Sequence, residues 1–141
     1  AHTVEHNARD VPTLGVCLGM QLMSLTHGGK LNQYMPDTHA TADDHTGCKQ
    51  HAIVITQMDT VLTSDAAALG LTAETIVSHH QQAIEDAGRL RVVATSTDDI
   101  IEAVDDPARL FYLGVQWHPE RGGEGPLNKG LITRFVQACG G

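Results

Sequence analysis

The hydrophobic positions of this chain fall mostly in short runs that are separated by polar turn segments. The runs are rich in β-branched residues and are bounded by turn residues, a pattern that is typical of strands. It predicts strands at residues 14–17, 51–55, 74–78, 89–96, 99–104 and 110–117. Between the first two of these, residues 34–50 are polar and carry Pro36 and Gly47, which predicts a long surface loop.

Helical spacing of apolar residues is clear in two places. One predicted helix covers residues 18–27 and ends at the glycine pair that follows, as a helix with a C-terminal glycine cap would. The other covers residues 127–139, with Pro126 near its start and Gly140 just past its end. A further helical turn is predicted over residues 65–70. The fold class is therefore α/β, with fewer helices than a complete doubly wound domain has.

Composition and charge exclude several classes of function. The chain has 141 residues, of which 41% are hydrophobic and 18% charged, as in a globular protein. The net charge of −8 argues against a nucleic-acid-binding surface, which needs clustered Lys and Arg. No apolar run approaches the length of a membrane-spanning helix, and the polar N-terminus is no signal peptide. Three cysteines without a C-x-x-C pair predict reduced thiols and a cytoplasmic location.

The stretch G-V-C-L-G places Cys17 between two glycines, where the first predicted strand meets the first predicted helix. A sharp strand-to-helix turn of this kind exposes a nucleophile and needs small neighbours, as in the G-x-S-x-G elbow of serine hydrolases. The helix N-terminus is expected to favour the thiolate, and the amide of Leu18 is expected to face an oxyanion. The alternative for Cys17 is an inert buried thiol, the usual fate of a free cysteine.

A second candidate element is W-H-P-E at the end of the last predicted strand. His118 would lie at the carboxyl end of that strand, where parallel α/β folds collect functional groups, and Glu120 could accept a hydrogen bond from its ring. Cys17, His118 and Glu120 would then form a nucleophile, a general base and an orienting acid. The alternative is a strand end followed by an ordinary turn.

The segments GVCLGMQ, LTHGGKL, HHQQAI and GVQWHPE, in this order, resemble the class I glutamine amidotransferase superfamily. Within it the chain is most similar to the γ-glutamyl hydrolase branch, peptidase C26, which includes γ-glutamyl-γ-aminobutyrate hydrolases. The resemblance implies a flavodoxin-like three-layer sandwich. It also implies that residues 1–141 form a single partial domain that lacks the family's N-terminal portion, since only about sixteen residues precede Cys17.

The resemblance also implies roles for individual residues. It makes Cys17, His118 and Glu120 the catalytic residues and Leu18 the source of an oxyanion amide. Gln21 would help to bind the γ-glutamyl group, and Ser78 and His80 match a segment that lines the pocket. No cofactor is implied. Val77 and Gln81 depart from the residues common in the branch, so the amine half of the substrate stays open.

The predicted function is that of a cysteine-dependent amidohydrolase that cleaves a small γ-glutamyl substrate through a thioester. Two alternatives remain: the glutaminase component of an amidotransferase, which passes ammonia to a synthase, and a catalytically silent fragment of the fold. Because the partial domain would expose a strand edge, the expected partners are a second copy of the chain or a separate N-terminal segment. Nucleic acid and membrane are not expected partners.

The nine histidines raise the question of a metal site. His39, His45 and His51 recur at six-residue steps in the polar segment, and His79 and His80 are adjacent. Neither arrangement matches a common zinc spacing, so the sequence predicts no metal and solvated loop histidines. The acidic pairs that begin at residues 43, 98 and 105 are likewise expected to be solvated at turns.

Overall fold

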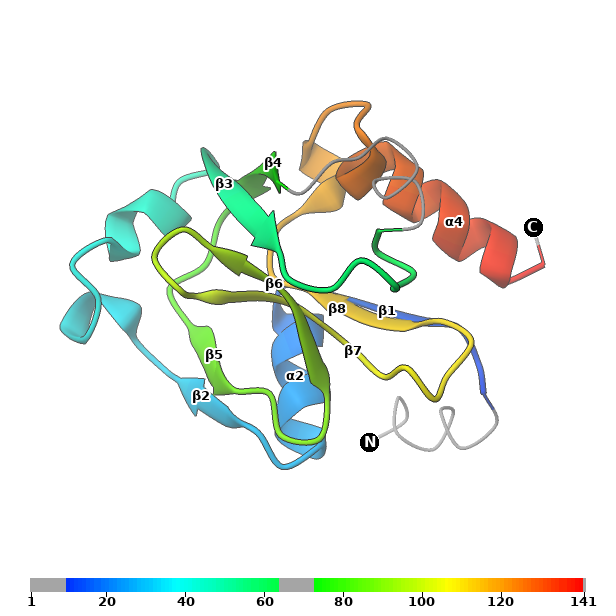
Figure 1. The fold of residues 1–141 in the computed structure, drawn as a ribbon. Coiled ribbons are helices and arrows are strands. Elements are labelled where there is room, and N and C mark those ends of the chain that lie inside the picture. The colour runs from blue at the N-terminus through cyan, green and yellow to red at the C-terminus, as the bar shows by residue number, and fades with distance from the viewer. Residues whose placement is uncertain (1–9, 64–72, 141) are drawn as a thin grey trace.

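The fold is described for residues 10–63 and 73–140 of a computed structural model, so the helical turn expected over residues 65–70 lies outside the described residues. Within these ranges the strands form a six-stranded sheet and a two-stranded sheet (Figure 1). The order in the larger sheet is β1 (Thr13–Val16), β8 (Tyr112–Val115), β7 (Ile101–Asp105), β6 (Arg91–Ser96), β3 (Lys49–Ile55) and β4 (Ala73–Ser78). The first pair, β1 and β8, is parallel, and the other neighbours are antiparallel.

Among the described residues, two α-helices cover opposite faces of the larger sheet (Figure 1). The helix α2 (Leu18–Thr26) follows β1 directly, as predicted. The helix α4 (Leu131–Ala138) is shorter than the segment predicted for it, because Pro126–Gly130 forms a π-helical turn ahead of it. A short antiparallel pair, β2 (Lys30–Asn32) with β5 (Ala83–Asp86), lies on the α2 side.

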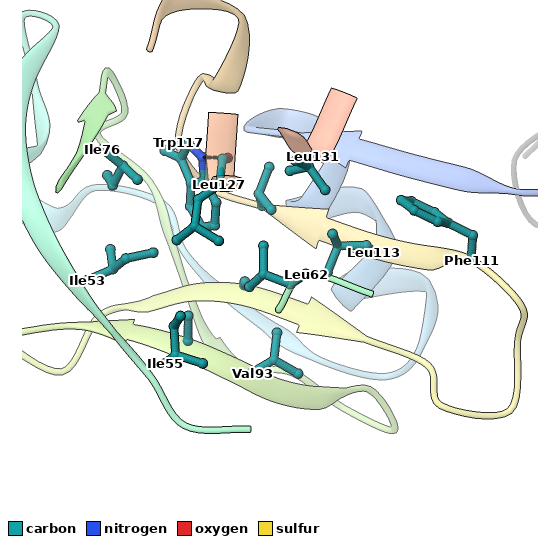
Figure 2. Packing of buried hydrophobic residues seen from close by; sticks show 13 residues of the cluster. Ile53, Ile55, Leu62, Ile76, Val93, Phe111, Leu113, Trp117, Leu127 and Leu131 are labelled. Atoms are coloured by element: carbon teal, nitrogen blue, oxygen red, sulfur yellow. Dashed lines mark hydrogen bonds between the residues drawn. The ribbon is translucent and has the colours of Figure 1, made fainter. Parts of the chain in front are cut away.

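The face of the sheet that packs against α4 carries the larger core (Figure 2). Trp117 lies at its centre, fully buried, and its indole N–H donates to the carbonyl of Leu127, 3.3 Å away. Alternation along β8 directs Leu113 and Val115 into the same core. Burial of these large side chains fixes the end of β8, which is the strand that leads into His118.

The opposite face packs against α2 through a smaller core built around Met20 and Met23. Gly114 of β8 faces this helix, and a Cβ atom at that position would lie 2.9 Å from Cγ of Met20. The absence of a side chain at Gly114 therefore lets α2 approach the sheet closely. This close approach sets the position of the turn between β1 and α2.

The predicted strands are all present within the described residues, and two further strands, β2 and β5, were not predicted. The segment 34–50 is less irregular than expected, since it contains the 3₁₀ turns η1 (Met35–Asp37) and η2 (Ala42–His45) and the start of β3. In the described part of the chain, no helix has both the length and the apolar character needed to cross a membrane.

Candidate active site

Cys17 occupies the turn between β1 and α2 in a strained backbone conformation. Its φ of 51° and ψ of −107° lie in a region that L-residues rarely adopt. Its N–H donates to the carbonyl of Val115 in the neighbouring strand at 2.8 Å, which ties the turn to the end of β8. A residue held in this way beside a chemical motif is typical of an active site.

The two flanking glycines have different environments. A Cβ at Gly15 would collide with Met23 and would lie 2.8 Å from the backbone carbonyl carbon of Gly19, so only glycine fits there. A Cβ at Gly19 would meet open space. The close turn therefore requires the first glycine for steric reasons, as the sequence predicts, whereas it does not require the second.

His118 and Glu120 form a hydrogen-bonded pair at the end of β8. Nδ1 of His118 is 2.7 Å from Oε1 of Glu120, and the backbone N–H of His118 donates to the carbonyl of Val77 at 3.0 Å. The side chain of His118 is 15% exposed and that of Glu120 is 50% exposed, so the pair is accessible to solvent. With Nδ1 donating to the carboxylate, Nε2 of the neutral ring carries the lone pair that a general base needs.

Strand register brings the two motifs to the same edge of the sheet. Val16 pairs with Val115 in the parallel ladder, and each strand then runs on into its motif. Among the described residues, no hydrogen bond joins Cys17 to His118. The contacts of the Cys17 thiol are instead Nε2 of Gln116 at 3.5 Å and the carbonyl of His79 at 3.9 Å. Catalytic hydrogen bonds are often loose before substrate binds.

Gln116 is a residue of this site that the sequence analysis missed. It is fully buried, donates from Nε2 to the Cys17 sulfur and accepts at Oε1 from Nε2 of Gln21 at 3.2 Å. Gln21 also donates to the carbonyl of Gln82 at 3.3 Å, so its amide is engaged within the protein. The only sequence signal for Gln116 was its position two residues before His118, on the same side of an extended strand.

The protonation state expected for Cys17 differs from the one that its surroundings favour. Burial raises the pKa of the Cys17 thiol, and this effect outweighs the hydrogen bonds from the Leu18 backbone and the Gln116 side chain, which lower it. The backbone N–H of Leu18 at the helix N-terminus thus favours the thiolate, as expected, but burial has the larger effect and leaves the pKa raised. Deprotonation of Cys17 needs a base.

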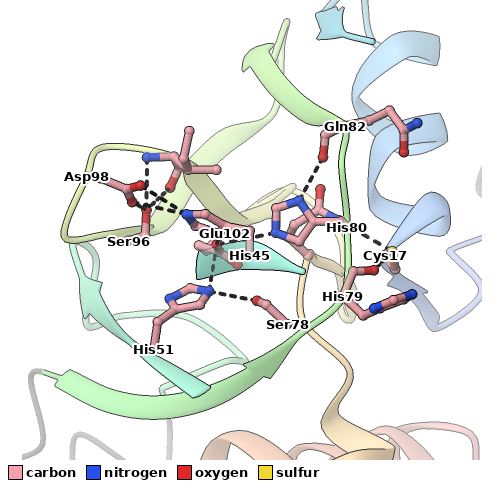
Figure 3. Close-up of polar contacts among 12 residues, drawn as sticks. Cys17, His45, His51, Ser78, His79, His80, Gln82, Ser96, Asp98 and Glu102 are labelled. Atoms are coloured by element: carbon pink, nitrogen blue, oxygen red, sulfur yellow. Dashed lines mark hydrogen bonds and ion pairs between the residues drawn. The ribbon is translucent and has the colours of Figure 1, made fainter. Parts of the chain in front are cut away.

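Ser78 and His80 do not direct their polar atoms toward Cys17. Oγ of Ser78 is 2.7 Å from Nε2 of His51, and Nε2 of His80 is 3.8 Å from Oε1 of Glu102 (Figure 3). The backbone of the same segment does approach the Cys17 side, through the carbonyl of His79. A pocket of about 360 Å³ lies along this segment and is lined by Thr46, His79, His80, Gln81 and Gln82. Its volume is within the usual range for small-molecule sites.

Several polar residues that were expected to be solvated are buried. His45 is 1% exposed, and together with His51 and His80 it surrounds the buried carboxylate of Glu102 (Figure 3). Oδ2 of Asp98 is 3.0 Å from Nε2 of His45. His80 and Glu102 come from segments far from His45 and His51 in sequence, so the six-residue spacing of those two histidines did not indicate the cluster.

Asp105 is an exception to the expectation that the acidic pairs are solvated at turns. It is buried and accepts two hydrogen bonds from the guanidinium of Arg91, at 2.8 and 2.7 Å. This bidentate pair joins β6 to β7. The prediction of a solvated turn is therefore wrong for Asp105, whereas Asp98 does lie at a turn and keeps 23% of its side chain exposed.

Comparison with solved structures identifies the class of fold. A protein of Thermoplasma acidophilum, provisionally described as a GMP synthase subunit, superposes with a TM-score of 0.70 at 16% sequence identity. The match covers 92% of this chain and 57% of that chain. The fold is thus the α/β fold of the class I glutamine amidotransferases, as the sequence predicts.

The family follows from the sequence comparisons. The profile of the peptidase C26 family matches residues 2–120, and the chain belongs to this family. A protein of Mycobacterium tuberculosis, provisionally named a glutamine amidotransferase, is 35% identical over 80% of this chain and 36% of its own length. A glutamine-hydrolysing GMP synthase subunit of Methanothrix thermoacetophila is 33% identical over 92% of this chain and 64% of its own length. The chain thus spans only part of each relative.

Proposed function

We propose that the chain hydrolyses a γ-glutamyl amide bond through a γ-glutamyl thioester on Cys17. The observation that carries this proposal is the strained Cys17 at the β1–α2 turn, in parallel register with the strand that ends at the His118–Glu120 pair. A thiol, a base and a group that orients the base are the parts that nucleophilic acyl transfer requires.

In the first half of the reaction, His118 takes the proton of the Cys17 thiol at Nε2, since Nδ1 is bonded to Glu120. The sulfur attacks the γ-carbonyl carbon, and the charge that develops on oxygen is stabilised by the backbone N–H of Leu18. The C–N bond then breaks, and the amine leaves with the proton from His118. The product on the enzyme is the γ-glutamyl thioester.

In the second half, water attacks the thioester carbon and gives a proton to His118. The C–S bond breaks, the sulfur recovers the proton, and glutamate leaves. Gln116 supports both halves, because its amide N–H points at the sulfur and stabilises it as an anion. Because Gln21 holds Gln116 in place, we propose a positioning role for Gln21 in addition to the substrate-binding role that the resemblance implies.

A second candidate function is the glutaminase component of an amidotransferase, in which ammonia passes to a synthase. The similarity to a glutamine-hydrolysing GMP synthase favours this alternative. The two functions share the thioester chemistry and differ in the amine that leaves. They also differ in whether a partner protein is needed for activity.

The experiment that tests the proposal measures glutamate release from γ-glutamyl-γ-aminobutyrate and from glutamine. The variant Cys17→Ala should lose release from both, and Cys139→Ala, which removes an exposed cysteine, is the matched control. Release from glutamine alone, and only with an added synthase, would favour the second function. If a folded protein releases no glutamate from either compound, the chain is a silent form of the fold and the proposal is wrong.

A further inference from the structure

Four buried polar atoms without hydrogen-bond partners face one another on the far side of residues 79–82 from Cys17. They are Nδ1 of His45, Nε2 of His80 and both carboxylate oxygens of Glu102 (Figure 3). Glu102 is fully buried, and the side chains of His45 and His80 are 1% and 0% exposed. Leaving a buried polar atom unpaired is destabilising, so four such atoms in one place indicate a missing partner.

In His45 and His80, one ring nitrogen faces Glu102 (the inner nitrogen) and the other faces away from it (the outer nitrogen). The hydrogen bond of the outer nitrogen determines whether the inner nitrogen carries a lone pair. Nε2 of His45 is 3.0 Å from Oδ2 of Asp98, and Nδ1 of His80 is 2.8 Å from the carbonyl of Gln82. Both neighbours are acceptors, so the proton of each neutral ring lies on the outer nitrogen. The inner nitrogens then direct lone pairs at a carboxylate that also has only lone pairs to offer.

His51 completes the arrangement from β3. Its Nδ1 is 3.2 Å from the carbonyl of Ala52, and its Nε2 is 3.5 Å from Oε1 of Glu102. The hydroxyl of Ser78, 2.7 Å from the same Nε2, can rotate away from it. Three imidazoles, each oriented by an outer carboxylate or carbonyl, therefore converge on one carboxylate. Metal-binding histidines are held by outer partners of this kind.

We propose that His45, His51 and Glu102 bind a divalent transition-metal ion of the zinc class. Nδ1 of His45 is 3.3 Å and Nε2 of His51 is 3.5 Å from Oε1 of Glu102, and the three ligand atoms lie within 4.8 Å of one another. Ligands at the usual zinc distances in a tetrahedron are separated by about 3.3 Å, so small side-chain rotations suffice. Two imidazoles and a carboxylate suit Zn²⁺.

The structure offers a candidate for the fourth ligand and a path by which an ion can enter the site. Nε2 of His80 is 3.8 Å from Oε1 of Glu102 and is the nearest candidate for the fourth ligand. A pocket of about 240 Å³ reaches the cluster from the surface and is lined in part by His45, His51 and Asp98. An ion from solution could therefore reach the ligands without unfolding the protein.

A proton on His45 is the alternative to a metal ion as the partner of Glu102. Burial by itself lowers the pKa of His45, but the neighbouring Glu102 and Asp98 outweigh this effect and leave the pKa raised. A charged His45 would also satisfy Glu102. Zinc binding must therefore be measured directly, rather than inferred from the stability of the cluster.

The experiment measures zinc binding by calorimetry and the bound metal by mass spectrometry, after the protein has been stripped with a chelator. Because thiolates also bind zinc, all variants carry serine at Cys17, Cys48 and Cys139. We expect one Zn²⁺ per chain and a higher melting temperature with zinc. The variant His51→Ala should lose binding, and His39→Ala, which lies outside the cluster, should not.

The variant Asp98→Asn tests the outer shell without removing a ligand. It should lower the zinc affinity by about 10–100-fold, as the loss of an outer-shell partner typically does. Circular dichroism on each variant shows whether it is folded. If the folded protein binds no stoichiometric zinc, or if both His51→Ala and Asp98→Asn bind it unchanged, the site is not a metal site and a proton holds the cluster.

Discussion

The described part of the chain contains two histidine–carboxylate arrangements that differ in exposure, in size and in the elements that form them. His118 and Glu120 form one short contact of 2.7 Å at the surface, and half of the Glu120 side chain is exposed. Glu102 is fully buried, and three histidines surround it at 3.3 to 3.8 Å without hydrogen-bond geometry. The first pair is small, local and partly exposed, whereas the second cluster is larger, assembled from several elements and mostly buried.

The difference indicates two different purposes. An exposed pair contributes little to stability because water competes for both groups, so its short contact serves to hold a ring in one orientation. A buried cluster changes the stability of the fold strongly, since an uncompensated charge cannot be solvated. We expect variants of the first pair to lose activity and variants of the second to lose stability.

The largest expected effect is on activity. Replacing His118 with Ala should lower kcat/KM for γ-glutamyl hydrolysis by about 10²–10⁴-fold, because general acid–base catalysis contributes that much. The free energy of unfolding should change little. Glutamate release and urea unfolding of the same preparation check this. If His118→Ala also lowered the free energy of unfolding substantially, His118 would be a structural residue. The contrast with the Glu102 cluster would then not hold.

The next expected effect is on stability. Replacing Glu102 with Ala in metal-free buffer should lower the free energy of unfolding by about 3–5 kcal/mol, because without a metal His45 carries the proton that pairs with Glu102, and the variant leaves that buried charge without its partner. Glu124→Ala is the matched control, because the Glu124 side chain is 83% exposed and should contribute less than about 1 kcal/mol. A cost for Glu102→Ala no larger than that of the control would show that the cluster is not structural.

A smaller effect is expected from packing at the elbow. Gly15→Ala would place a Cβ against Met23 and the α2 backbone and should cost about 1–3 kcal/mol. Gly19→Ala places a Cβ in open space on the same helix and should be neutral or slightly stabilising. Thermal unfolding of the two variants compares them directly. Equal losses of thermal stability would mean that the turn requires glycine at both positions.

The smallest expected effect is on the reactivity of the thiol. Since burial raises the pKa of Cys17, the neutral thiol prevails at neutral pH, and alkylation should accelerate as pH rises toward the pKa and level off above it. Gln116→Met should slow alkylation below the pKa by about twofold to fivefold, because one hydrogen bond to the sulfur is lost. Mass spectrometry resolves Cys17 from the other cysteines. An unchanged profile would show that Gln116 does not influence the thiol.

The sequence was informative where structure is local. The elbow at Cys17 and the strand end at His118 lie on contiguous motifs, and the helix after Cys17 falls where it was predicted. The face that it buries was not predicted, because Leu18, Leu22 and Leu25 are exposed and Met20 and Met23 pack against the sheet. The strand β2 was missed because three residues are too few to show an alternating pattern, and its partner β5 has only four residues, of which Ala83 and Ile84 are buried.

The buried cluster could not be predicted, for a different reason. His45 comes from the turn η2, His51 from β3, His80 from the segment after β4, and Glu102 from β7. Each of these residues is ordinary in its own stretch of sequence, and only the sheet order brings them together. Gln116 was missed in the same way, since its contacts are with Cys17 and Gln21, about a hundred residues earlier in the chain.

The four residues 79–82 between β4 and β5 contact both the elbow around Cys17 and the cluster around Glu102. Their backbone carbonyls meet Cys17 and Gln21 on one side, and the ring of His80 meets Glu102 on the other. Exposed connections between strands are usually the places where a chain accepts inserted residues or a cut. This connection should accept neither. A tag, a circular-permutation site or a fusion placed here would disturb the elbow at Cys17 and the Glu102 cluster at once, so protein engineering should leave the connection intact.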